Sequence, residues 1–260
     1  MFRRSVGFVG GGRIARILLS GLNRVALTRS RIVVADPDET AVQRLRSLVD
    51  RLDVVPGDNR AAAAQEIVFL AIHPPAFGPV LNEIKTTLKP DAIVVSLAPK
   101  HSFARLSEML GGFDRLARMI PNAPSLVGAG FNPIAFASTL LADDRMELTD
   151  LLRPLGELPE VVEAKLEAYA ILTAMGPTYF WPQWYELQAL AEEFGLSPEE
   201  AADGLRAMVV GALATMGEAR LSPEEVQNLI PVKPLSDAEE MIRQAYRTKL
   251  TAQMEKIRPQ

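Results

Sequence analysis

A glycine-rich turn near the N-terminus holds the first residues whose types and spacing could do chemistry. Gly10, Gly12 and Ala15 form the pattern G-x-G-x-x-A, which follows an apolar run and opens an amphipathic segment. The first glycine permits a tight turn, the second lets the backbone approach a phosphate, and the small third residue lets helix and strand pack closely. Arg13 and Ile14 would then lie in the first turn of a helix, where free N–H groups and the positive dipole end attract a pyrophosphate. The pattern indicates dinucleotide binding.

An acidic residue follows at the spacing that this interpretation needs. Asp36 ends the next apolar run, about 20 residues after the turn, where a carboxylate can accept a hydrogen bond from the adenosine ribose. The alternative role for Asp36 is to cap the following helix or to hold a turn. Asp36 would repel a 2′-phosphate and argues for NAD, whereas Arg13 could pair with that phosphate and argues for NADP. The sequence favours NAD.

The elements that must position these residues alternate over the first 163 residues. Short apolar, β-branched runs predict strands, and the amphipathic stretches between them predict helices, which is typical of βαβ units with a parallel sheet. The predicted strands are 5–9, 31–35, 53–55, 67–71, 92–96, 116–119, 132–137 and 158–162, and the predicted helices are 14–23, 40–52, 75–88 and 103–110. The fold class is therefore α/β, with a Rossmann-type dinucleotide-binding domain over residues 1–163.

Helix signals replace the strands after about residue 163, so residues 164–260 are predicted as an all-α domain. Ser197, Ser222 and Ser236 each precede a glutamate by three residues, which predicts three capping boxes. Residues 207–214 are apolar on every side of a helix and need a cover that this short domain cannot supply alone. We therefore expect a two-fold homodimer joined through the C-terminal helices.

Composition excludes several classes of function. The 260 residues carry a formal net charge of −4, which gives no electrostatic reason to expect nucleic acid as a partner. There is no cysteine and there are only two histidines, so no metal site is expected, and a reducing cytoplasm fits best. The N-terminus has no h-region of a signal peptide, and no apolar run reaches the roughly 20 residues of a membrane span.

Three stretches give the chain a resemblance to the pyrroline-5-carboxylate reductase family over nearly its whole length. Residues 7–15 resemble the family's G-F-I-G-x-G-N-M-A, residues 119–128 resemble M-P-N-T-P-A-x-V-G, and residues 174–179 resemble S-G-S-G-P-A-Y. The second stretch is the most specific, because nucleotide binding in general does not require Pro-Asn-x-Pro. A weaker match is residues 70–75, where the family has A-V-K-P-Q beside the cofactor.

The resemblance implies hydride transfer from reduced NAD or NADP to the C=N bond of a cyclic imine, as in proline biosynthesis, in a homodimer whose active sites are completed by helices of the partner. It also assigns roles to residues at matching positions. Cofactor contacts fall on Ile72, His73, Pro74, Pro121 and Asn122, in addition to the glycine turn and Asp36; catalytic positions on Asn122, Thr178 and Tyr179; and substrate contacts on Gly176, Pro177 and Thr178. For His73 a hydrogen bond to the neighbouring backbone is an equally good alternative. Lys233 has no match in the family, and its charge makes it a further candidate for substrate binding.

The residues themselves agree with an imine in one respect. Related hydroxyacid dehydrogenases need a lysine on the long helix as an acid–base group, and residues 174–195 contain no lysine. A protonated imine is already electrophilic, so its reduction needs orientation more than it needs an acid.

Two departures from the family pattern shape the expected specificity. The family's S-P-G-G-T-T segment, whose donors face the substrate, is replaced by residues 229–236 with two prolines and Lys233, which predicts that pyrroline-5-carboxylate itself is a poor substrate. A dinucleotide-binding paralogue without turnover, acting in regulation or interaction, stays open as the alternative.

The second departure is at Lys100 and His101, which replace a small-residue turn of the family. These two residues could meet an anion or the nicotinamide ribose, but the favoured interpretation is that they are solvated loop residues.

Overall fold

The chain forms two compact units. The computed structural model describes residues 4–24, 31–48 and 52–259. The first unit comprises Met1–Met175 together with Gln253–Gln260, and the second comprises Gly176–Ala252. The boundary therefore lies 12 residues beyond the predicted one at 163/164, and the C-terminal end returns to the first unit. The reason is an apolar cluster in which Leu166, Ala170 and Ile257 pack on Ile120 and Ala135 of the first unit.

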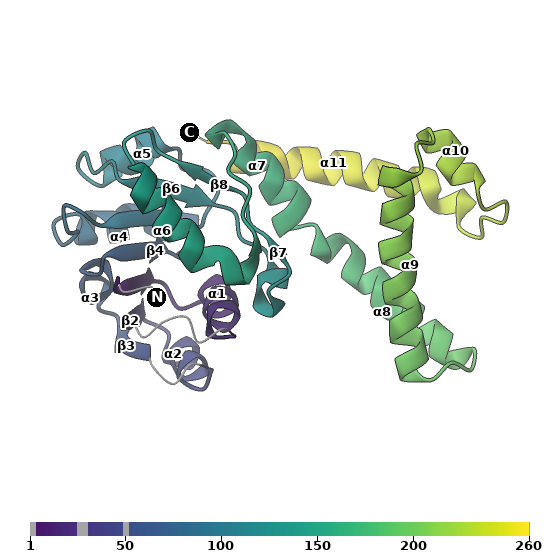
Figure 1. Cartoon of the computed structure of the whole chain (residues 1–260), viewed down its shortest axis with the longest axis horizontal. Coiled ribbons are helices and arrows are strands. Elements are labelled where there is room, and N and C mark those ends of the chain that lie inside the picture. The colour runs from purple at the N-terminus through teal and green to yellow at the C-terminus, as the bar shows by residue number, and fades with distance from the viewer. Residues whose placement is uncertain (1–3, 25–30, 49–51, 260) are drawn as a thin grey trace. The chain divides into compact units, whose positions relative to one another are not determined.

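A seven-stranded sheet forms the centre of the first unit. The strands are β1 (Val6–Val9), β2 (Ile32–Asp36), β3 (Leu52–Pro56), β4 (Ile67–Leu70), β5 (Ile93–Ser96), β6 (Leu116–Met119) and β8 (Ile134–Phe136). Their order is β3-β2-β1-β4-β5-β6-β8, and every neighbouring pair is parallel except β6 with β8 (Figure 1). This order confirms the predicted Rossmann-type α/β fold.

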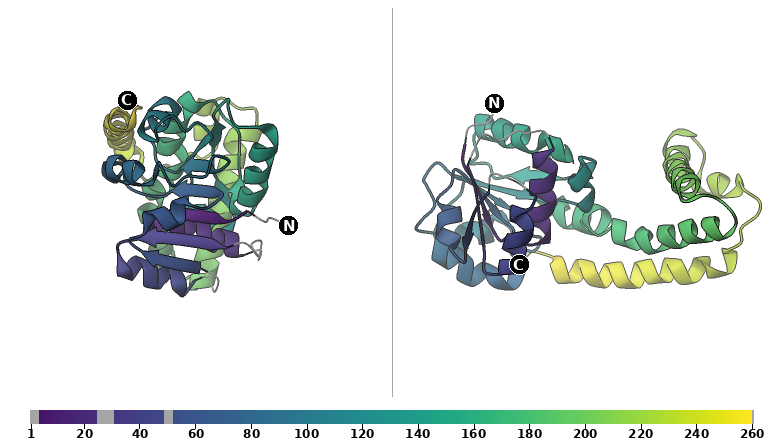
Figure 2. Two further views of the ribbon diagram at one scale, coloured as in Figure 1. Left: turned by 90° about the vertical axis from the view of Figure 1, so that its left-hand side faces the viewer. Right: turned by 90° about the horizontal axis from the view of Figure 1, so that it is seen from below.

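Helices cover both faces of this sheet (Figure 1; Figure 2). One layer contains α1 (Arg13–Asn23), α2 (Glu39–Arg46) and α6 (Ala142–Leu152), and the other contains α3 (Asn59–Ala63), α4 (Phe77–Ile84) and α5 (Phe103–Met109). Strand residues alternate between the two apolar clusters: Phe8 and Phe69 face the α1 layer, whereas Val9 and Val68 face the α4 layer. Burial on both faces explains why the strands are continuously apolar.

Several predicted boundaries differ from the structure. The predicted helix 40–52 is too long, because α2 ends at Arg46 and β3 begins at Leu52. The predicted strand 132–137 is shortened to β8, and 158–162 contributes only a bridge between Ile134 and Glu160. Helices α3 and α6 were not predicted. The remaining short elements of this unit are η1 (Pro74–Ala76), η2 (Ala123–Val127), β7 (Gly130–Phe131), η3 (Arg153–Leu155), β9 (Gly156–Glu157), η4 (Glu163–Lys165), α7 (Leu166–Tyr169) and η5 (Ala170–Ala174).

The second unit is helical. It contains α8 (Pro177–Glu193), α9 (Pro198–Glu218), α10 (Pro223–Asn228), η6 (Ser236–Ala238) and most of α11 (Glu239–Ile257). Both side-chain and backbone bonds of the capping boxes at Ser197 and Ser222 are present, as predicted. The third predicted capping box is wrong, because Ser236 lies inside the 3-10 turn η6 and not before a helix. Among the described residues, no helix has the length and apolar character to cross a membrane.

Candidate functional site

The glycine turn lies at the point where the strand order reverses. Strand β1 pairs with β2 on one side and with β4 on the other, so the loops after β1 and β4 run in opposite directions and leave a crevice at the carboxyl end of the sheet. Gly10 has a φ of 101°, and a Cβ there would come within 2.6 Å of the Ala71 carbonyl oxygen. Only glycine therefore fits the first position of the turn.

Gly12 has a different reason to be glycine. A Cβ built on Gly12 meets no heavy atom within 4 Å, so the space in front of it is open in the protein alone. Gly12 is the N-cap of α1, and no side chain caps the helix there by a hydrogen bond. The first turn of α1 contains no acidic residue. The free N–H groups of this turn therefore face an open space that suits a pyrophosphate.

A cavity of about 460 Å³ extends along this crevice. Its lining contains predicted cofactor residues from the ends of β1, β2 and β4, together with the loop after β5. The lining residues are Gly10, Gly12, Arg13, Ile14, Asp36, Pro37, Ala71, Ile72, His73, Ala76, Leu97, Ala98 and Pro99. The structure therefore brings together seven predicted cofactor residues around one cavity at the carboxyl end of the sheet, which is where a dinucleotide binds in this fold: Gly10, Gly12, Arg13, Ile14, Asp36, Ile72 and His73.

The carboxylate of Asp36 is held by the backbone around it. Its Oδ2 accepts a hydrogen bond from Gly11 N at 2.6 Å, and its Oδ1 accepts one from Asp38 N at 2.8 Å. Asp38, and not Asp36, caps α2, since its side chain accepts from Thr40 N. Asp36 thus holds the glycine turn against the end of β2. This agrees with the alternative in which Asp36 holds a turn, but not with the one in which it caps the helix.

The other predicted cofactor residues lie outside this cavity's lining. Ala15 is fully buried behind the turn, where its small side chain packs in the core. Pro74 begins η1, and its side chain is outside the part that the structure describes. Pro121 and Asn122 follow β6, where Asn122 is 7% exposed.

The amide of Asn122 is bound within the protein. Its Oδ1 accepts a hydrogen bond from Phe131 N at 3.1 Å, and its Nδ2 donates to the Thr173 carbonyl oxygen at 3.4 Å. Its backbone N donates to Asn132 Oδ1 at 3.2 Å. The Pro-Asn-x-Pro segment therefore ties β6 to β7 and to η5, which gives Asn122 a structural role in addition to any contact with a ligand.

The predicted substrate and catalytic residues after Met175 belong to the second unit. Gly176 is buried at the start of α8, Pro177 begins that helix, and Thr178 is exposed. Burial and, secondarily, the neighbouring Tyr246 raise the pKa of Tyr179 above its ordinary value, so the phenol stays protonated and can donate a hydrogen bond. Lys233 is exposed and its Nζ donates to Asn228 Oδ1 at 3.2 Å.

The loop after β5 is built on a buried ion cluster. Lys100 has a φ of 87°, a backbone conformation that residues other than glycine rarely adopt. Its backbone N–H donates to Glu167 Oε1 at 3.2 Å. The N–H of Phe103 donates to Glu163 Oε1 at 2.6 Å. Both carboxylates also bind the buried Arg118. This cluster therefore holds the loop whose residues Leu97, Ala98 and Pro99 line the cavity.

His101 is not simply a solvated loop residue. Its ring packs on Phe77 with the centroids 4.6 Å apart, and its Nε2 is buried without a hydrogen-bond partner among the described residues. Burial, followed by the charges of Lys100, Arg118 and Arg105, lowers the pKa of His101, so the ring is held neutral.

Sequence reasoning missed Arg16 and Arg44, which line a second cavity next to the glycine turn. Arg16 lies one turn after Arg13 on α1, and this i, i+3 spacing could have indicated it. Arg44 and Arg118 carried no local signal. No group of three or more potential metal ligands occurs in the described part of the chain.

Comparison with known proteins gives consistent matches. Residues 5–100 match a family model described as NADP oxidoreductase, coenzyme F420-dependent. The pyrroline-5-carboxylate reductase of Corynebacterium melassecola is 28% identical over 226 residues, which cover 86% of this chain and 83% of that protein. The solved pyrroline-5-carboxylate reductase of Coxiella burnetii has a TM-score of 0.70 at 26% identity and covers 98% of this chain and 94% of its own. The NADP-bound pyrroline carboxylate reductase of Plasmodium falciparum has a TM-score of 0.77 at 19% identity, over 98% of this chain and 95% of that one.

Proposed function

We propose that this chain, which belongs to the pyrroline-5-carboxylate reductase family, reduces the C=N bond of a cyclic imine with a nicotinamide dinucleotide. In this reaction a hydride from reduced nicotinamide bonds to the imine carbon, the C=N π electrons move to the protonated nitrogen, and the products are a cyclic amine and the oxidised dinucleotide. The observation that carries the proposal is the open space in front of Gly12, at the N-terminus of α1 and inside the crevice.

The crevice supplies binding and orientation more than acid–base chemistry. Gly12 and the first turn of α1 would hold the pyrophosphate, and the fixed loop 97–99 would form the wall on the side of β5. Since a protonated imine already carries the charge that attracts a hydride, alignment of the two reacting carbons is the main requirement. The absence of lysine from residues 174–195 agrees with this chemistry.

The proposed substrate is an imine other than pyrroline-5-carboxylate, such as one with a larger or a substituted ring. Residues 229–235 contain Pro231 and Pro234, which have no N–H, and Lys233, which offers a single point charge. Gly176, Pro177 and Thr178 would form the pocket wall, Tyr179 would donate from its protonated phenol, and Asn122 would position nicotinamide or substrate.

The proposed assembly is a two-fold homodimer through the second unit. Helix α9 exposes large apolar side chains along its C-terminal half, with exposed fractions of 52% for Met208, 63% for Val210 and Leu213, and 68% for Met216. Burying one such side chain contributes roughly 1.5–3 kcal/mol, so a partner surface on this helix would be strongly favoured. A second copy offers the same surface about a two-fold axis.

The test is a hydride-transfer assay with the purified chain, a panel of cyclic imines and both reduced cofactors. We expect cofactor oxidation that depends on an imine and on protein concentration, with formation of the corresponding amine. The alternative, a dinucleotide-binding paralogue without turnover, is favoured only by the loss of the family's donor segment at residues 229–236. Tight cofactor binding with no reduction of any imine in the panel would support that alternative.

A further inference from the structure

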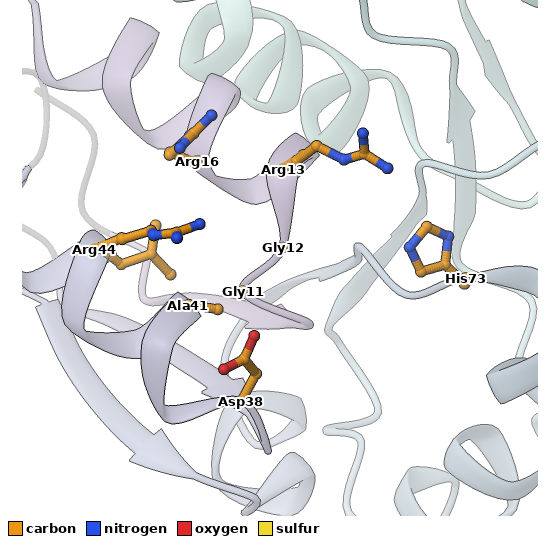
Figure 3. A pocket seen from close by; sticks show the side chains of 9 residues that line it. Gly11, Gly12, Arg13, Arg16, Asp38, Ala41, Arg44 and His73 are labelled. Carbon is orange, nitrogen blue, oxygen red and sulfur yellow. The ribbon is translucent and has the colours of Figure 1, made fainter.

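A second cavity of about 220 Å³ adjoins the crevice on the side of β2. Helix α1 contributes Arg13 and Arg16 to its lining, and α2 contributes Arg44 (Figure 3). Gly12, Arg13 and His73 line both cavities, so the two spaces meet at the glycine turn. The remaining lining residues are Gly11, Asp38, Ala41 and Leu45.

The charges around this cavity do not balance. Arg13, Arg16 and Arg44 form no ion pair with a carboxylate in residues 4–24, 31–48 or 52–259, and all three are exposed. The acidic residue in the lining is Asp38, whose Oδ1 already accepts from Thr40 N. With Asp36 counted as well, three guanidinium groups stand against two carboxylates. The cavity therefore has a net positive charge and planar donors that suit an oxyanion.

The position of the cavity identifies which oxyanion would fit. A pyrophosphate would occupy the first turn of α1, whereas this cavity extends from there toward Asp38, Ala41 and Arg44 after β2. In this fold the hydroxyls of the adenosine ribose lie near the residue that ends β2. A phosphate on the ribose 2′ oxygen carries about −1.5 to −2 charge at neutral pH and would project into this space.

We propose that Arg16 and Arg44, together with Arg13, bind the 2′-phosphate of NADP and make the chain selective for NADPH over NADH. This inference rests on the proposed function and reverses the preference that Asp36 suggests in the sequence. It can do so because both oxygens of Asp36 are bound to the backbone N–H groups of Gly11 and Asp38, and because the three arginines outnumber the two carboxylates around the cavity.

Calorimetric titration of the full-length protein with NADPH and with NADH, in the absence of an imine, tests the inference. We expect the wild type to bind NADPH about tenfold more tightly or better, since charge-assisted hydrogen bonds are gained only with the 2′-phosphate. Arg16→Gln and Arg44→Gln should each weaken NADPH binding about tenfold and leave NADH binding nearly unchanged, and the double variant should lose the preference. Added salt should weaken NADPH binding more than NADH binding.

The matched control is Arg60→Gln, which removes the same charge from an exposed arginine on α3, on the opposite face of the sheet. It should leave both affinities unchanged. Equal affinities in the wild type, or an unchanged ratio in the double variant, would overturn the assignment of the arginines while leaving imine reduction intact. Binding of neither dinucleotide would overturn the inference and the proposed function together, and NADPH binding without turnover of any imine would overturn the proposed reaction alone.

Discussion

Arg118 on β6 and Glu167 on α7 form an ion pair in which both side chains are 1% exposed, with Arg118 Nη2 at 2.5 Å from Glu167 Oε1. A second carboxylate, Glu163, binds Arg118 Nη1 at 2.9 Å. Because the same two glutamates accept N–H groups of Lys100 and Phe103, the cluster connects the end of the sheet to the loop that lines the crevice.

Removing the arginine should leave the buried Glu167 and the partly exposed Glu163 without their counter-charge. Arg118→Met is therefore expected to lower the free energy of unfolding by about 3–5 kcal/mol. Chemical denaturation followed by circular dichroism measures this change. Arg105→Ala, which breaks an exposed i, i+3 pair with Glu108, should cost less than about 1 kcal/mol. Similar losses in both variants would show that the buried cluster contributes nothing special.

Gly12→Val should abolish dinucleotide binding and preserve the fold. The new side chain would project into open space, so it should displace no protein atom but should occupy the approach to the first turn of α1. We expect calorimetric affinity to fall by about two orders of magnitude or more, with an unchanged circular dichroism spectrum. Gly78→Val, on α4 with equal free space around its Cβ, should bind normally. Unchanged affinity in a folded Gly12→Val protein would defeat the site assignment.

Acidification should destabilise the protein through His101. Its pKa is lowered in the folded state, so the unfolded chain binds more protons as the pH falls below the ordinary value of about 6.5. The free energy of unfolding should therefore decrease as the pH falls from about 6.5 through the lowered pKa of His101. Above about pH 6.5 His101 should make no pH-dependent contribution to it. Denaturation curves at about pH 7.5 and pH 5.5 measure the difference. In His101→Phe, which keeps an aromatic ring against Phe77, the decrease should be smaller; an equal decrease would show that other groups cause it.

Light scattering at micromolar concentration should give the mass of a dimer. Leu213→Glu on α9 should shift the protein toward monomer, because a charge would be buried in the proposed interface. The control is Met146→Glu on α6, which changes an apolar side chain of similar exposure, 61% against 63%, in the first unit. A monomeric wild type would contradict the proposed assembly, and equal dissociation by both variants would place the interface elsewhere.

Steady-state kinetics should show pyrroline-5-carboxylate to be a poor substrate. Each charge-assisted hydrogen bond that the substrate carboxylate loses at residues 229–236 should cost about 1.5–3 kcal/mol, of which Lys233 restores only a part. A kcat/KM below about 10⁴ M⁻¹s⁻¹, with a higher value for a larger or substituted ring, is expected. A value in the ordinary enzyme range with pyrroline-5-carboxylate would show that other donors replace the lost segment.

The sequence by itself determined the features that arise from neighbouring residues. The glycine turn, the apolar strands around Phe8 and Phe69, and the capping boxes at Ser197 and Ser222 depend on contacts within a few positions of the chain, so their patterns are visible in the residue types. The βαβ alternation then limits the topology, because parallel crossovers in one sheet are right-handed.

Only the tertiary structure decided which distant side chains meet. Arg16 and Arg44 lie on different helices and share a cavity because α1 and α2 pack on the same face of the sheet. Arg118 binds Glu167, which lies 49 positions later in the chain. Ile257, near the C-terminus, packs in one apolar cluster with Ile120 and Ala135 of the first unit. Residue type and spacing along the chain carry no signal for such pairs, since charge and packing act through space, and their partners are fixed only when the sheet and its helical layers assemble.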